Sequence, residues 1–206
     1  RDQPRSRGLG DVYKRQWQTI IDRLLADDYS MQDRMMIRGT VRTGDGKECR
    51  KRALNDIVIS RAGFSRLIGL DVYVNGSFLN AYEGDGIIIS TPTGSTGYNL
   101  SAGGPIVDPM ARLMIITPVC PHSLTSKSIV LPSDAKVSIE IAKKRKTQDT
   151  EAIVSFDGGN DFELAAGDVL DICVSQRTTQ LVKASDVNFY EILRNKLGGK
   201  LSLIHI

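Results

Sequence analysis

Short apolar segments recur along this chain, and turn-forming residues separate them. Ile87–Ile89 is the clearest example, a β-branched run that follows Gly86 and precedes Thr91-Pro92. Such a run, bounded by residues that break regular structure, predicts a buried strand that ends abruptly. The strand would deliver its carboxyl end to the loop that follows.

A hairpin is expected where Asn75-Gly76 separates Leu70–Val74 from Phe78–Tyr82, because Asn-Gly suits a type I′ turn, whose two central residues both need positive φ. Asp157-Gly158-Gly159-Asn160-Asp161 is interpreted as a second turn between strands. Further strands are predicted at Met35–Thr43, Lys51–Ser60, Ser128–Leu131, Lys136–Ala142, Ala152–Phe156, Phe162–Leu164, Val169–Val174 and Gln180–Lys183. Trp17–Leu25 and Ser185–Leu197 have the apolar spacing of helices. The pattern predicts a mainly β fold with some α, a layered β-sandwich.

The loop after Ile89, STPTGSTGYNLSAGGP, consists largely of glycine and hydroxyl residues. A short helix is expected from Ser95 to Ala102, with Gly103-Gly104-Pro105 as its stop signal. Backbone N–H groups at such a junction, together with the hydroxyls of Thr93, Ser95 and Thr96, suit a base, a ribose or a phosphate. An ordinary capped strand-to-helix turn is the alternative, and a single Ser/Thr/Gly cluster does not exclude it.

Composition narrows the function classes. The chain has 206 residues and a net charge of +3, and its basic residues are matched by 24 acids, so a nucleic-acid partner is not expected. The basic run Lys143-Lys144-Arg145-Lys146 is interpreted as a solvated hairpin tip. No apolar run approaches bilayer length, so we expect no membrane association and a cytoplasmic location.

The cysteines and histidines give no metal or disulfide pattern. Cys49, Cys120 and Cys173 are odd in number and widely spaced, and with His122 and His205 as the only histidines a zinc site has little support. Neither a GxxxxGK[ST] phosphate loop nor a GxGxxG fingerprint occurs in the chain. A nucleotide would therefore have to bind in another way.

Three segments together resemble the NAD kinases, the enzymes that phosphorylate NAD to NADP. STPTGSTGYNLSAGGPIVDP is similar to that family's nucleotide-binding segment, Ala53-Leu54-Asn55-Asp56 to its Asn-Glu/Asp motif, and residues 116–124 to its Thr-Pro…Pro-His-Ser-Leu segment. The resemblance covers residues 17–197 and implies the NAD kinase C-terminal domain, with most of the N-terminal α/β domain missing. Residues 1–16 are expected to be a non-native extension and residues 198–206 a partly non-native tail.

The resemblance also implies a set of NAD-binding residues. Asn55 would bind the adenine and Asp56 the ribose hydroxyls. Asp85, Tyr98 and Ser101 would face the nicotinamide half. The implied set is Asn55, Asp56, Asp85, Thr93, Thr96, Gly97, Tyr98 and Ser101. Gly97 stands where the family usually has alanine, and Gly159 stands where a longer polar residue is usual.

The implied reaction is phosphoryl transfer from ATP, with Mg²⁺ or another divalent cation, to the adenosine ribose 2′-hydroxyl of NAD. The family's catalytic aspartate lies in a Gly-Gly-Asp-Gly-Thr motif that this chain lacks, so the chain is expected to be a truncated and impaired enzyme. Assembly as a homodimer or homotetramer is implied as well. A non-catalytic adenine-nucleotide-binding domain, a related lipid or sugar kinase and a purely structural β-domain stay open as alternatives.

Overall fold

The computed structural model describes residues 17–62, 67–123, 126–143 and 152–197. The described residues fall into two compact units. Arg34–Thr179 forms the larger unit, and the described residues before and after it, 17–33 and 180–197, form the smaller one.

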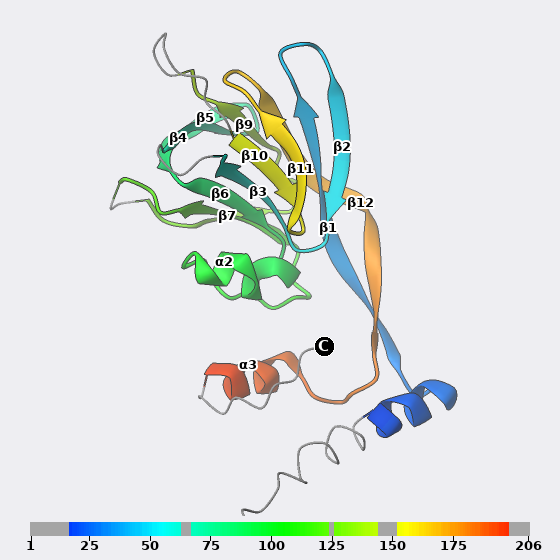
Figure 1. The fold of residues 1–206 in the computed structure, drawn as a ribbon. Coiled ribbons are helices and arrows are strands. Elements are labelled where there is room, and N and C mark those ends of the chain that lie inside the picture. The colour runs from blue at the N-terminus through cyan, green and yellow to red at the C-terminus, as the bar shows by residue number, and fades with distance from the viewer. Residues whose placement is uncertain (1–16, 63–66, 124–125, 144–151, 198–206) are drawn as a thin grey trace, which may run out of the picture. The chain divides into compact units, whose positions relative to one another are not determined.

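Two six-stranded sheets build the larger unit (Figure 1). The strand order is β2-β1-β12-β9-β4-β5 in the first sheet and β11-β10-β3-β6-β7-β8 in the second. The first sheet contains β1 (Ser30–Arg42), β2 (Glu48–Ala53), β4 (Ile68–Val74), β5 (Ser77–Gly84), β9 (Val137–Ile141) and β12 (Val169–Lys183). The second contains β3 (Asp56–Arg61), β6 (Gly86–Ser90), β7 (Leu113–Val119), β8 (Ile129–Pro132), β10 (Ala152–Phe156) and β11 (Gly159–Leu164).

A single apolar core joins the two sheets. Ile37 and Ile139 from the first sheet and Ile57 and Ile87 from the second are at most 1% exposed and belong to one cluster. Because side chains alternate across a strand, these residues come from the facing sides of both sheets. The fold is a mainly β, two-sheet sandwich, as the sequence predicts.

The outer face of the second sheet is also buried at its centre. Ile88 points away from the core that Ile87 and Ile89 enter, yet it is 0% exposed. The segment that follows β6, with the 3₁₀ helix η1 (Thr93–Thr96) and the short helix α2 (Tyr98–Ser101), lies beside β6 (Figure 1). A strand covered on both faces explains why residues 87–89 are apolar without interruption.

Several sequence predictions are confirmed. β6 contains Ile87–Ile89, and Asn75 and Gly76 have φ of 50° and 80° in the hairpin between β4 and β5. The turn predicted at Asp157-Gly158 has the same signs, with φ of 50° and 79°. It joins β10 to β11, which pair antiparallel.

The single strand predicted over Lys51–Ser60 is wrong. β2 ends at Ala53 in the first sheet, and β3 begins at Asp56 in the second. Leu54-Asn55 is therefore a crossover between the sheets. Lys51–Ser60 contains neither glycine nor proline, so no strong break signal in the sequence marked the point at which the chain changes sheets.

Other parts of the sequence prediction also need correction. β7 was not foreseen, the two strands predicted at Val169–Val174 and Gln180–Lys183 are one strand, and the helix predicted from Ser95 to Ala102 is split into η1 and α2. The basic run after Ala142 connects β9 to β10, which belong to different sheets, so it does not close a hairpin. Its residues 144–146 lie outside the described part of the chain.

The smaller unit contains the two predicted helices. Residues 17–25 are helical, and α3 (Phe189–Leu197) follows β12. Arg23 Nη1 lies 3.0 Å from Asp186 Oδ2 and holds the two ends of this unit together. The segments predicted to be non-native, 1–16 and 198–206, lie outside the described residues. Within the described residues, no helix has the length and apolar character needed to cross a membrane.

Candidate functional site

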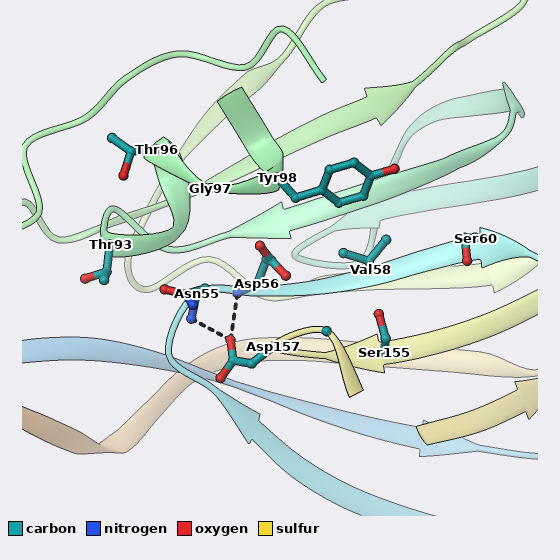
Figure 2. A pocket seen from close by; sticks show the side chains of 11 residues that line it. Asn55, Asp56, Val58, Ser60, Thr93, Thr96, Gly97, Tyr98, Ser155 and Asp157 are labelled. Atoms are coloured by element: carbon teal, nitrogen blue, oxygen red, sulfur yellow. Dashed lines mark hydrogen bonds between the residues drawn. The ribbon is translucent and has the colours of Figure 1, made fainter. Parts of the chain in front are cut away.

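A pocket of about 530 Å³ lies on the outer face of the second sheet (Figure 2). Asp56, Val58 and Ser60 form its floor, since alternate residues of β3 point to the same face. Ser155 of β10 lies opposite Val58 in the antiparallel register and extends this floor. The volume falls within the roughly 300–1,000 Å³ typical of small-molecule sites.

The walls come from two loops on either side of β3. Figure 2 shows the loop after β6 on one side and the turn after β10 on the other, as expected from the order β10-β3-β6. The residues that line the pocket are Asn55, Asp56, Val58, Ser60, Thr93, Thr96, Gly97, Tyr98, Ser155, Asp157 and Gly158.

The loop after β6 is bonded to the crossover between the sheets. Thr91 Oγ1 donates to Leu54 O at 2.6 Å, and Thr91 N donates to Asn55 O at 2.9 Å. A Cβ at Gly94 would lie 2.1 Å from Asn55 O, closer than any side chain tolerates. Glycine at this position therefore allows the two segments to touch.

A buried amide fixes the other end of this loop. Asn99 is 0% exposed, and its Nδ2 donates to Ser95 O and Pro105 O, each at 3.0 Å. Thr117 of β7 donates its hydroxyl to Asn99 Oδ1 at 2.7 Å. Asn99 thereby satisfies its polar groups inside the protein and ties the loop to the sheet. These bonds link two of the segments that carry the family resemblance.

Asp157 binds the crossover from the opposite side. Its Oδ2 accepts from Leu54 N at 2.8 Å, and its Oδ1 accepts from Asn55 N at 2.7 Å and from Asp56 N at 3.2 Å. Asp157 N donates to Asp56 O at 3.0 Å. The crossover is thus held between Asp157 and Thr91, with its backbone groups satisfied on both sides.

Asp56 has an unusual electrostatic environment. The residue is 7% exposed, and burial, followed by the nearby charge of Asp157, raises the pKa of its carboxyl to about 6. Burial disfavours the charged form, and a second carboxylate adds repulsion. Asp56 consequently changes its charge close to neutral pH.

The structure places most of the predicted NAD-binding residues together. Those that line the pocket are Asn55, Asp56, Thr93, Thr96, Gly97 and Tyr98. Asp85 and Ser101 do not line it. Asp85 precedes β6, at the opposite end of the strand from the Gly/Thr loop, and its Oδ1 lies 2.8 Å from Arg61 Nε. Ser101 is exposed at the end of α2. Their predicted contacts with the nicotinamide half remain predictions.

Sequence reasoning missed part of this pocket. Asp157 was interpreted as a turn residue, apart from a short Asp-Gly match to the family, and Val58, Ser60 and Ser155 were not singled out. The alternation that puts Asp56, Val58 and Ser60 on one face would have identified the floor, had β3 been recognised as a separate strand. Nothing in the sequence signals that Asp157 accepts bonds from residues a hundred positions earlier.

Metal ligands are not gathered at this site. Among the described residues, no group of three or more His, Cys, Asp or Glu side chains could hold a metal ion. Both oxygens of Asp157 already accept backbone hydrogen bonds.

The fold and the site define a two-sheet β domain with a pocket lined by amide, hydroxyl and carboxyl groups. Comparison with known families identifies this domain more specifically. Residues 54–184 match the family described as the ATP-NAD kinase C-terminal domain. The matched range contains every residue that lines the pocket.

Curated relatives carry the same name. The chain is 45% identical over 194 residues to an NAD kinase of Lachnoclostridium phytofermentans, covering 93% of the chain and 68% of the relative. It is 51% identical over 179 residues to an NAD kinase of Agathobacter rectalis, covering 87% of the chain and 62% of the relative. The chain belongs to the NAD kinase family.

Solved structures share the fold. A yeast NADH kinase complexed with NADH has a TM-score of 0.84 at 25% identity, covering 93% of this chain and 57% of that one. An NAD kinase from Archaeoglobus fulgidus in complex with ATP has a TM-score of 0.64 at 24% identity, covering 90% and 64%. The chain thus spans 57–68% of the length of these four proteins.

Proposed function

We propose that this chain forms the NAD-binding part of an NAD kinase, with the pocket on the outer face of the second sheet holding the adenosine moiety of NAD. The observation that carries the proposal is that Asn55 and Asp56 line one pocket with Thr93 and Thr96, residues distant in sequence and assigned by resemblance to the adenosine half. The 45–51% identity to NAD kinases and the likeness to a NADH kinase complexed with NADH support the same ligand class.

The chemistry of the lining residues fits a nucleoside better than a phosphate chain. No lysine, arginine or histidine is among the residues that line the pocket. An asparagine supplies the donor and acceptor that an adenine edge requires, and a carboxylate can accept from two adjacent ribose hydroxyls. We therefore assign Asn55 to the adenine and Asp56 to the ribose, with Thr93, Thr96 and Gly97 completing the adenine side.

The proposed reaction transfers the γ-phosphoryl group of ATP to the 2′-hydroxyl of the adenosine ribose. The hydroxyl oxygen forms the new P–O bond, ADP leaves, and the hydroxyl proton passes to a base. ATP as the donor is supported by the name of the family. Mg²⁺ or another divalent cation would accompany the ATP phosphates, as phosphoryl transfer from ATP normally requires.

The base is the part of the proposal that this sequence does not supply. No Gly-Gly-Asp-Gly-Thr motif occurs in the 206 residues. We therefore propose that the proton acceptor is not among the residues that line this pocket. The chain is then expected to bind NAD with little or no turnover.

The first experiment is titration calorimetry of the chain with NAD, followed in the same sample by an assay of ATP-dependent NADP formation. Binding without turnover is the expected result. Turnover would contradict the claim that this chain lacks the base. Failure to bind either NAD or adenosine would contradict the proposed function.

The orientation of NAD can be tested through Tyr98, which is 48% exposed and which we assign to the nicotinamide half. Tyr98→Ala is expected to weaken the binding of NAD several-fold, with a smaller effect on adenosine. Equal losses for the two ligands, measured by calorimetry, would reject this placement.

Assembly into a homodimer or homotetramer and a cytoplasmic location belong to the same proposal. Both rest on the family resemblance alone. Light scattering of the purified chain would test the assembly, and a single monomeric mass at micromolar concentration would count against it.

A further inference from the structure

The crossover Leu54-Asn55 creates a local problem for the backbone. The chain leaves the first sheet after Ala53 and joins the second at Asp56, so the N–H groups at this point cannot all bond to neighbouring strands. A backbone donor that has no strand partner needs another acceptor, either water or a side chain. The group that accepts from these N–H groups therefore also fixes the backbone of Asn55 and Asp56, the two residues assigned to adenosine.

The carboxylate of Asp157 accepts from three consecutive N–H groups, those of Leu54, Asn55 and Asp56. Hydrogen bonds to an ionised acceptor are stronger than those between neutral groups. The figure of the site shows the bonds from Asn55 and Asp56 converging on Asp157 (Figure 2). The turn and the crossover therefore form one bonded unit.

A turn by itself does not need this arrangement. Asn75, in a hairpin with the same φ signs, accepts from a single N–H, that of Lys136, at 2.8 Å. Asp157, in contrast, faces the pocket that Asn55 and Asp56 also line. Its carboxylate is directed toward the segment that carries these side chains.

We infer that Asp157 is a positioning residue, which holds the backbone of Asn55 and Asp56 so that their side chains face the adenosine of NAD. The inference rests on the proposed function, because it takes the pocket as the nucleoside site. Asp157 acts through the crossover, since both of its oxygens accept from backbone donors.

The charge of Asp157 has a second effect that distinguishes this role from simple folding. It contributes, after burial, to the raised pKa of Asp56. Tyr98 is the other ionisable side chain that lines the pocket. Removing the charge of Asp157 should lower the pKa of Asp56, so the pH at which NAD affinity changes should move downward.

The test compares the wild-type chain with Asp157→Asn by titration calorimetry with NAD between pH 5 and pH 8. The amide has the same size and tolerates positive φ, but its NH₂ cannot accept from the crossover. At pH 7.5 we expect a loss of affinity of about tenfold or more for both NAD and adenosine. The midpoint of the affinity–pH curve is expected to fall.

Asn75→Ala is the matched control, because it removes a side-chain bond to the backbone in the corresponding turn of the first sheet. It is expected to lower the melting temperature and to leave the NAD affinity and its pH midpoint unchanged. A wild-type affinity and midpoint in Asp157→Asn would overturn the inference. A parallel loss of affinity in Asn75→Ala would also overturn it, since the effect would then be one of general stability.

Amide hydrogen exchange in the unliganded wild type covers the case in which Asp157→Asn does not fold. The N–H groups of Asn55 and Asp56 should exchange slowly if Asp157 holds them, and fast exchange at both would overturn the inference. Wild-type binding separates this result from the proposed function. If the wild type binds neither NAD nor adenosine, the proposed function is rejected. Hydrogen exchange of the Asn55 and Asp56 amides then tests only whether Asp157 holds this part of the backbone.

Discussion

Two turns of this protein have nearly the same backbone conformation but different structural roles. Asn75-Gly76 and Asp157-Gly158 have φ values of 50° and 80° and of 50° and 79°. The first closes a hairpin in the outermost strands of the first sheet, and its side chain bonds to Lys136 N. The second bonds to three N–H groups of a crossover and lines a pocket. Turn chemistry fixes the local conformation, while the neighbouring segment determines whether the turn contributes to a site.

The largest change we expect comes from the other side of the crossover. Gly94→Ala would place a Cβ 2.1 Å from Asn55 O, and backbone atoms cannot move aside easily. We expect a loss of about 3 kcal/mol or more in the free energy of unfolding and no measurable NAD binding. Urea unfolding and calorimetry would measure both.

Gly97→Ala is the control for this prediction. The nearest atom to its Cβ would be Gly94 O at 3.3 Å, and alanine is the residue usual in the family. Stability within about 1 kcal/mol of the wild type is expected. A Gly94→Ala protein as stable as Gly97→Ala would show that the crossover is not held from this side.

The next effect concerns the side chains that the Asp157 turn holds in place. Asn55→Ala or Asp56→Ala should weaken NAD binding by about 1–3 kcal/mol, because each removes hydrogen bonds to the ligand. Calorimetry measures the change directly. Unchanged affinity in both variants would mean that the pocket beside this turn is not the adenosine site.

Acidification should have a smaller effect. Asp56 would bind ribose hydroxyls as a carboxylate, and its pKa is raised to about 6. The ionised fraction therefore falls between pH 7.5 and pH 5.5, and NAD affinity should fall about fourfold. A flat affinity over this range would exclude an ionised Asp56 as the ribose ligand.

The same pKa predicts the opposite trend for stability. A carboxyl whose pKa is raised on folding stabilises the fold fully below its ordinary value near 3.8 and loses this contribution as the pH rises through about 6. Asp56→Asn cannot ionise, so its melting temperature relative to wild type should increase from pH 4 to pH 7. A constant difference between the two proteins would contradict the raised pKa.

The smallest effect on ligand binding is expected at the comparison turn. Asn75→Ala removes the bond to Lys136 N and puts alanine at positive φ, which should lower the free energy of unfolding by about 1–2 kcal/mol. NAD affinity should not change. A loss of NAD affinity in Asn75→Ala would contradict the claim that only the Asp157 turn contributes to the binding site.

The local pattern was sufficient for much of this protein. The Ile87–Ile89 run, the Asn75-Gly76 hairpin and the Asp157-Gly158 turn follow from residue preferences that act over a few positions, and the structure contains all three. The motifs around Asn55 and Thr93 were sufficient to assign the family, which the matches to NAD kinases confirm. Short-range steric preferences and side-chain alternation depend only on residues a few positions apart, so the sequence alone determines them.

Only the tertiary structure decided how these pieces meet. Neither glycine nor proline occurs near Leu54-Asn55, so no strong local signal showed that the chain changes sheets there. The bonds from this crossover to Asp157 and to Thr91 join residues far apart in sequence. Burial of Asp56, followed by the charge of Asp157, raises the pKa of its carboxyl, and both effects exist only in the folded chain. Burial and long-range hydrogen bonding depend on which strands become neighbours, and that is determined by packing of the whole core rather than by any one segment.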